Sequence, residues 1–169
     1  MKQVNLPTTL IQPYERELET LCRAIALSQG QFSLILAHCN DTRLQKQLAQ
    51  RLQAICAIAI RELVLPESAQ TLYSTIVATL GNEQPRALMV FGLESVRDCD
   101  RILISANLVR DEFRKRFSFP LVLWVTDEVL RKLIRLAPDF ESWASVPIDF
   151  TTSPVQSPVE NSPQVQYSA

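Results

Sequence analysis

The side chains of this sequence that could do acid–base chemistry follow its apolar runs. His38 and Asp41 come directly after the first such run, and Glu94 follows another shortly after it ends. An imidazole beside a carboxylate can act as a general acid–base pair, and nucleotide-hydrolysing enzymes carry an acid after a strand to hold Mg²⁺ or activate water. His38, Asp41 and Glu94 are therefore the candidate catalytic residues, although a single histidine at a strand end is more often structural.

Amide, hydroxyl and carboxyl groups in the same stretches could contact a cofactor. The candidates for this role are Asn40, Thr42, Thr126 and Asp127. In a receiver-like phosphoacceptor domain, Asn40 and Asp41 would mimic the acidic pair and Thr126 would mimic the switch hydroxyl. An atypical enzyme would instead require the catalytic candidates and Asp127 to converge in one pocket.

A nucleotide-hydrolysing enzyme also needs a phosphate-binding loop, G-x-x-x-x-G-K-[ST], between a strand and a helix. The corresponding stretch here, AHCNDTRLQKQL, contains no glycine, and Lys46 lies inside the predicted helix instead of at its start. Asp41 places a negative charge where phosphate oxygens would lie. We therefore predict that the chain is not an enzyme and that it holds no cofactor.

The elements that position these residues are strands and helices in regular alternation. Apolar runs predict strands at about 32–37, 58–65, 87–91, 121–125 and 148–150. Helical periodicity predicts helices at about 13–28, 41–55, 67–80, 95–117 and 127–137. The sequence thus predicts a three-layer α/β/α fold with a mainly parallel sheet of about five strands, preceded by an N-terminal helix. The candidate residues should gather at the carboxyl edge of that sheet.

Composition divides the chain into three parts. An N-terminal extension over 1–12 precedes an α/β domain over 13–150, and a Ser/Pro-rich tail over 151–169 is predicted to be disordered because it cannot bury enough apolar surface.

Charge and cysteine content exclude several function classes. The net charge of −1 argues against binding to nucleic acid or to an anionic membrane, and the short apolar runs argue against a membrane span. Four cysteines and one histidine without C-x-x-C spacing argue against a metal site. Cys22, Cys56 and Cys99 have apolar neighbours and are predicted to be small core residues, which fits a reducing cytoplasm.

A cluster of basic residues lies at the end of the predicted helix over 95–117. It consists of Arg110, Arg114, Lys115 and Arg116. Positive charge at a helix C-terminus complements the helix dipole, and the cluster is also the candidate contact surface for an acidic protein partner.

Three stretches of the chain resemble a known family. They are LCRAIALSQGQFSLILAHCN, VFGLESVRDCDRILISANLVRDEFRKRF and FPLVLWVTDEVLRKLIRLAPDFESWAS. Together they resemble the N-terminal P-loop-like region of large cyanobacterial multidomain proteins that carry repeat arrays, which are related to STAND and AAA-type signalling ATPases. The resemblance spans about 14–150 and implies a P-loop NTPase-like core used for regulation or scaffolding. It also implies that Glu94 falls at the Walker B acid and Thr126 near the sensor position.

The sequence therefore predicts a cytoplasmic, non-catalytic regulatory or scaffolding module that binds a protein partner. One alternative is an atypical nucleotide-binding switch or ATPase that uses Glu94 and the loop from His38 to Asp41. A further alternative is a receiver-like phosphoacceptor domain.

Overall fold

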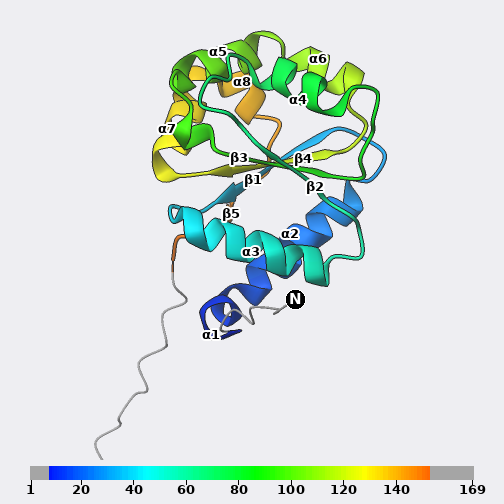
Figure 1. Ribbon diagram of the computed structural model, residues 1–169, viewed down its shortest axis with the longest axis vertical. Helices are drawn as coiled ribbons and strands as arrows, with labels where there is room; N and C mark the ends of the chain where they lie inside the picture. Colours follow the sequence, from blue (N-terminus) through cyan, green and yellow to red (C-terminus); the bar gives the residue numbers. More distant parts are fainter. Residues whose placement is uncertain (1–7, 153–169) are drawn as a thin grey trace, which may run out of the picture.

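A sheet of five parallel strands lies between two layers of helices in the computed structural model, which describes residues 8–152 (Figure 1). The strands are β1 (Ser33–His38), β2 (Arg61–Val64), β3 (Leu88–Phe91), β4 (Pro120–Val125) and β5 (Ile148–Asp149). One layer contains α1 (Thr8–Ile11), the 3₁₀ turn η1 (Gln12–Tyr14), α2 (Glu15–Leu27) and α3 (Thr42–Ile55). The other contains α4 (Leu72–Leu80), α5 (Cys99–Leu108), α6 (Arg110–Arg116), α7 (Asp127–Leu136) and α8 (Pro138–Glu141). This architecture confirms the predicted three-layer α/β/α fold.

Two of the predicted segments reach beyond the described part of the chain. Residues 153–169 of the predicted tail and 1–7 of the predicted extension lie outside it. Within 8–12 the extension forms α1, where Ile11 is buried against the domain. Every helix of the described residues is too short or too polar to span a bilayer.

The strand order is β2-β3-β4-β1-β5, which places β1 inside the sheet. The last residue of β1, His38, is in register with Val125 of β4 on one side and with Asp149 of β5 on the other. Receiver-like domains have the order 2-1-3-4-5, so the receiver alternative does not fit this topology. Because β1 and β4 are neighbours, the loops that follow them lie side by side at the carboxyl edge.

Each face of the sheet contributes to its own core. On β1, Leu34 and Leu36 pack in the core beneath α4–α8, whereas Ile35 and Ala37 pack in the core beneath α2 and α3. All six residues of β4 are buried. Burial on both faces explains why these strands are apolar throughout and not alternating.

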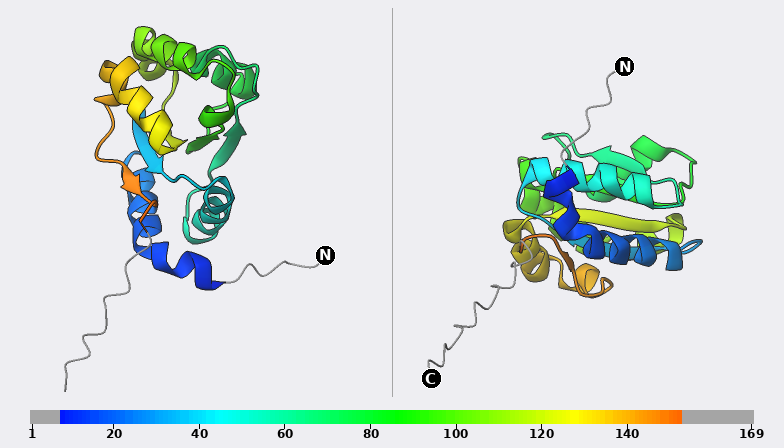
Figure 2. Two further views of the ribbon diagram at one scale, coloured as in Figure 1. Left: turned by 90° about the vertical axis from the view of Figure 1, so that its left-hand side faces the viewer. Right: turned by 90° about the horizontal axis from the view of Figure 1, so that it is seen from below.

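The last strand is short and lies at the edge of the sheet. It lies beside α2 (Figure 2). Phe150, the residue after it, is buried between Tyr14 and Trp124, with ring centroids 6.0 Å and 5.5 Å away. This aromatic contact fixes the position of β5, and with it the position of Asp149.

The predicted helix over 95–117 is wrong in two respects. Its N-cap is Asp98, whose Oδ1 accepts a hydrogen bond from the Arg101 amide at 3.1 Å, whereas Ser95 belongs to the 3₁₀ turn η2 (Leu93–Ser95). Val96 is extended and buried, so the helix begins only after it. The helix is also divided into α5 and α6 at Val109, whose φ of −106° and ψ of 18° depart from helical values.

Two further predicted elements are shorter in the structure. The helix predicted over 67–80 begins at Leu72, because Thr71 is its N-cap and accepts a hydrogen bond from the Ser74 amide at 3.1 Å. The strand predicted over 58–65 is limited to Arg61–Val64, the segment that pairs with β3.

The structure corrects the prediction for two cysteines. Cys22 of α2 and Cys56, directly after α3, form a disulfide with their Cα atoms 5.6 Å apart, and both residues are half-buried. Sequence neighbours could not reveal this pairing, because it depends on how α2 packs against α3. We call Cys22 and Cys56 the cysteine pair. Cys39 and Cys99 are free, the first buried and the second half-buried.

Candidate functional site

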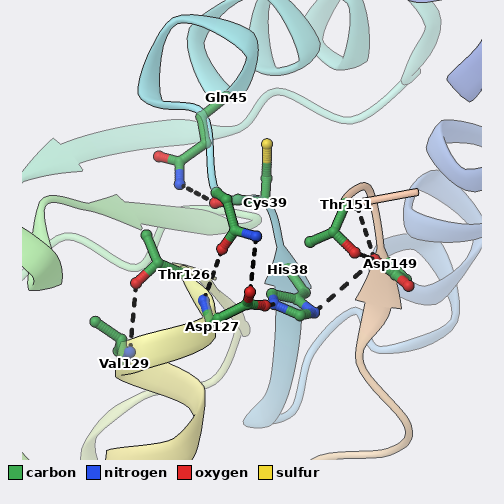
Figure 3. A network of polar contacts seen from close by, with 9 residues as sticks. His38, Cys39, Gln45, Thr126, Asp127, Val129, Asp149 and Thr151 are labelled. Atoms are coloured by element: carbon green, nitrogen blue, oxygen red, sulfur yellow. Dashed lines mark hydrogen bonds and ion pairs between the residues drawn. The ribbon is translucent and has the colours of Figure 1, made fainter. Parts of the chain in front are cut away.

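Polar side chains from three neighbouring strands lie together at the carboxyl edge of the sheet (Figure 3). His38 ends β1, Asp127 begins α7 after β4, and Asp149 ends β5. With Asn40, which follows β1, they form what we call the carboxyl-edge network. Ligands of open parallel sheets bind at this edge, which makes the network the candidate site.

His38 lies between two carboxylates. Its Nε2 is 2.5 Å from Oδ1 of Asp127, and its Nδ1 is 3.9 Å from Oδ1 of Asp149. Since Asp127 is ionised and can only accept, Nε2 is the donor in the shorter contact. The His38 side chain is only 15% exposed. The imidazole is therefore hydrogen-bonded to the start of α7 and lies near the end of β5, and its Nε2 is already engaged and not open to a substrate.

Asn40 and Asp127 bind each other through two hydrogen bonds. The Asn40 side-chain amide donates to Oδ2 of Asp127 at 3.0 Å, and the backbone amide of Asp127 donates to the Asn40 carbonyl oxygen at 2.8 Å. The hydrogen bond from Asn40, followed by that from His38, lowers the pKa of Asp127. These contacts hold the β1–α3 loop against the start of α7.

Asp149 completes the network from the edge strand. Its Oδ1 accepts hydrogen bonds from the Thr151 hydroxyl at 2.5 Å and the Thr151 amide at 2.7 Å. The hydroxyl first and the amide second lower the pKa of Asp149, and the nearby His38 adds to the effect. Within residues 8–152, no group of three or more His, Cys, Asp or Glu side chains is placed to hold a metal ion.

The loop between β1 and α3 is closed by its own side chains. Asp41 is the N-cap of α3, and its Oδ1 accepts hydrogen bonds from the amides of Arg43 at 2.9 Å and Leu44 at 3.3 Å. Thr42 is the first residue of α3 and is exposed. A bound phosphate uses such helix-start amides, so the Asp41 carboxylate occupies the donors that a phosphate would need.

Two further groups stabilise this loop from inside. The buried Gln45 donates from its side-chain amide to the Cys39 carbonyl at 2.8 Å, and the Cys39 amide donates to the Val125 carbonyl at 2.9 Å. The Cys39 sulfur points away from the His38 ring (Figure 3). Burial raises the pKa of the Cys39 thiol to about 11, so this cysteine is not an activated nucleophile.

This chain matches no protein-family model, no curated protein and no solved structure. Its function has to be inferred from the geometry of its own site.

The predicted convergence of four catalytic and binding residues is only partly realised. His38 and Asp127 are in contact, but Asp41 caps α3 and Glu94 lies in η2. Glu94 lines two cavities, of about 240 and 490 Å³, that lie beyond β3 and that His38 does not line. Its Oε2 is buried and has no hydrogen-bond partner among the described residues.

Thr126, the remaining cofactor candidate, has a structural role. It is the N-cap of α7, and its hydroxyl accepts a hydrogen bond from the Val129 amide at 3.3 Å. The hydroxyl faces the helix that it caps (Figure 3).

Each member of the predicted basic cluster has a partner within the domain. Arg110 donates to the Asn107 carbonyl at 2.7 Å, and Arg114 lies over the Trp143 ring at 3.9 Å from its centroid. Lys115 pairs with Glu112 at 3.4 Å. Arg116 donates to the Gly81 carbonyl at 3.3 Å. The cluster stabilises α6 against its neighbours, and its charge is less available to a partner than the sequence suggested.

Two residues of the site were missed by sequence reasoning. Asp149 had a weak signal, because it lies in the strand predicted over 148–150, but its position beside His38 depends on the register between β1 and β5. Gln45 had none, since a glutamine in the first turns of a helix is usually exposed.

Proposed function

We propose that this chain is a non-catalytic protein-interaction module with a degenerate P-loop NTPase-like fold. The observation that carries the proposal is the β1–α3 loop, where the Asp41 carboxylate already accepts the Arg43 and Leu44 amides. An anionic ligand at this place would have to displace an anionic side chain that is covalently part of the loop.

The topology supports the same proposal. Starting from the β5 edge, the strand order is 5-1-4-3-2, in which the first strand is interior and lies beside the fourth. This arrangement brings the loop after β1 next to the residues that follow β4. Here two hydrogen bonds between Asn40 and Asp127 join these loops to each other.

Exposed apolar side chains indicate where a protein partner would bind. Ile104 and Leu108 of α5 and Ile134 of α7 are 44%, 75% and 53% exposed. The two helices pack together, with Asp100 and Lys132 paired at 3.0 Å. Interaction sites use exposed apolar area, so we place the partner on α5 and α7 and not on the internally paired basic residues of α6.

One observation favours a second candidate, the atypical nucleotide-binding switch. The cavity of about 490 Å³ between α3 and the ends of β2 and β3 is lined by Lys46, Glu62 and Glu94 among others. Its volume is in the range of small-molecule sites. Because two carboxylates and only one ammonium group line this cavity, a polyphosphate would be repelled. We therefore rank the nucleotide-binding switch second.

Calorimetric titration with ATP and ADP in the presence of Mg²⁺ separates the two candidates. The interaction module is expected to show no binding at millimolar nucleotide, for the wild type and for Lys46→Ala alike. Micromolar binding that Lys46→Ala abolishes would overturn the proposal and establish the switch. Micromolar binding unaffected by Lys46→Ala would equally overturn the proposal, because nucleotide would then bind elsewhere on the domain.

A cytoplasmic location is part of the same proposal. It is supported by the two free cysteines, and it requires that the disulfide between Cys22 and Cys56 can be reduced in the folded protein. Fractionation of the native cell would test it, and recovery of the chain with secreted proteins would overturn it.

A further inference from the structure

The cysteine pair is more accessible to solvent than the buried Cys39. Cys22 and Cys56 are both half-buried, and both line a surface cavity of about 480 Å³ between α2 and the end of α3. By contrast, Cys39 is buried at 1% exposure, with a thiol pKa raised to about 11. A small reagent can therefore reach the sulfur atoms of the pair without unfolding the domain.

We propose that the cysteine pair is a reversible redox site that exchanges with small thiols of the glutathione type. The disulfide joins Cys22 of α2 to Cys56, the residue directly after α3, 34 residues apart in sequence. Because α2 and α3 pack together, the bond can form or break without rearranging either helix. Leu18, Leu21 and Ile25 of α2 are fully buried, and they hold that helix in place whether or not the bond exists.

The cavity beside the cysteine pair is lined by both positive and negative side chains, which favours a transient encounter with glutathione over tight binding. Arg23 and Arg51 line it, and positive charge favours the thiolate form of a cysteine and attracts the carboxylates of glutathione. Glu15 and Glu19 line it as well, and Glu15 pairs with Arg51 at 2.7 Å. Because the two arginines are balanced by two glutamates, we expect glutathione to react with the disulfide without first forming a saturable complex with the protein.

The reaction proceeds in two balanced exchanges. A glutathione thiolate attacks one sulfur of the pair, so that a mixed disulfide forms and the other cysteine leaves as a thiolate. A second glutathione thiolate attacks the mixed disulfide, which releases oxidised glutathione and the second cysteine thiolate. Two electrons pass from two glutathione molecules to the protein, and oxidised glutathione reverses both steps.

Reduction should loosen one connection of the fold. Cys56 is followed by residues 57–60, which lead to β2, and the exposed Ala57 and Ala59 belong to this segment. In the oxidised state it is fixed at one end by the disulfide and at the other by a hydrogen bond from the Gln53 side chain to the Ile60 carbonyl at 2.7 Å. Without the disulfide, only the hydrogen bond and the packing of Ile60 remain.

The test is equilibration of the folded full chain in glutathione buffers of graded ratio, followed by acid quench, alkylation and peptide mass spectrometry. Cys22 and Cys56 are expected to change together, with the reduced fraction following [GSH]²/[GSSG]. Reduction should also lower Tm by about 10 °C and speed hydrogen exchange in residues 57–60. Cys99→Ser, which leaves the pair intact, should behave like the wild type.

Two results would overturn the proposal. A pair that stays oxidised in reduced glutathione until the chain is unfolded would be a purely structural disulfide. A chain with four free thiols in every buffer would have no disulfide at this position. Cys22→Ser and Cys56→Ser should each remove the response of Tm to glutathione, and a response that persists in either variant would also contradict it.

Discussion

The two ends of α3 are fastened by different chemistry. At its N-terminus, Asp41 caps the helix and Asn40 binds Asp127 at the start of α7. At its C-terminus, Cys56 is bonded to Cys22 of α2. The first fastening consists of exposed hydrogen bonds and charges, each of modest energy, and the second is one covalent bond.

Because the bonds differ, the two ends of α3 should respond to different chemical conditions. The N-terminal fastening depends on ionised carboxylates and is sensitive to acid, whereas the C-terminal fastening is sensitive to thiols. The comparison also shows that the N-terminus of α3 has a structural role in place of a ligand-binding one. A P-loop protein leaves a helix N-terminus open for phosphate, whereas here the protein's own Asp41 occupies the N-terminus of α3. The following predictions test this contrast, first through stability, in order of decreasing effect, and then through thiol reactivity.

The largest effect is expected from breaking the cysteine pair. Closing a loop of 34 residues restricts the unfolded chain, so Cys22→Ser should lower the free energy of unfolding of the oxidised protein by about 4 kcal/mol. Urea unfolding with and without reductant measures this loss. With reductant, the variant and the wild type should unfold at nearly the same urea concentration. A similar loss in Cys99→Ser would show that the effect is not specific to the pair.

The next effect is expected at the other end of α3. Asp41→Ala removes the acceptor of two amides and should destabilise the domain by about 1 kcal/mol. Asp41→Asn is the matched control, because asparagine is an equally good N-cap, and it should lose much less. Equal losses in the two variants would show that charge and not capping is the important property. Thermal unfolding monitored by circular dichroism distinguishes the two.

A smaller effect is expected from acid. The pKa of Asp127 is lowered in the folded state by Asn40 and His38, so its stabilising contribution is present above the ordinary carboxyl pKa of about 4. That contribution is lost as the pH falls through the lowered folded-state pKa. Asp127→Asn should therefore lower Tm by a few degrees at pH 7, and the difference from the wild type should shrink towards pH 3.

The control for this titration is Asp111→Asn, which alters an exposed acid of α6. Its difference from the wild type should be smaller at pH 7. If the Asp127→Asn difference stayed constant from pH 7 to pH 3, ionisation of Asp127 would not be what stabilises the network.

The fold could be predicted from the sequence because its signal is local and strong. The central strands β1, β3 and β4 are continuous apolar runs, and burial on both faces requires such runs. The predicted limits were less accurate for elements whose ends depend on contacts with neighbouring strands or helices. The long predicted helix is divided at Val109, and β2 is shorter than its apolar segment because only four of its residues pair with β3.

The candidate site could be predicted only as a location. Topology brings His38, Asn40 and Asp127 to one edge, but their hydrogen bonds depend on side-chain geometry that no sequence pattern specifies. Asp149 and the cysteine pair required contacts between distant segments. Strand register brings Asp149 to His38, and helix packing brings Cys56 to Cys22.

The slowest thiol reaction is expected at Cys39, which lies in the loop before the N-terminus of α3. With a pKa of about 11, only about 0.1% of its thiol is ionised at pH 8, and burial slows access further. In the reduced folded protein, iodoacetamide should therefore modify Cys22 and Cys56 long before Cys39, as peptide mapping would show. In denaturant all four cysteines should react at similar rates, which controls for local sequence. Modification of folded Cys39 as fast as Cys22 would mean that thiol reactivity is not confined to the C-terminal end of α3, and the contrast between its two ends would fail.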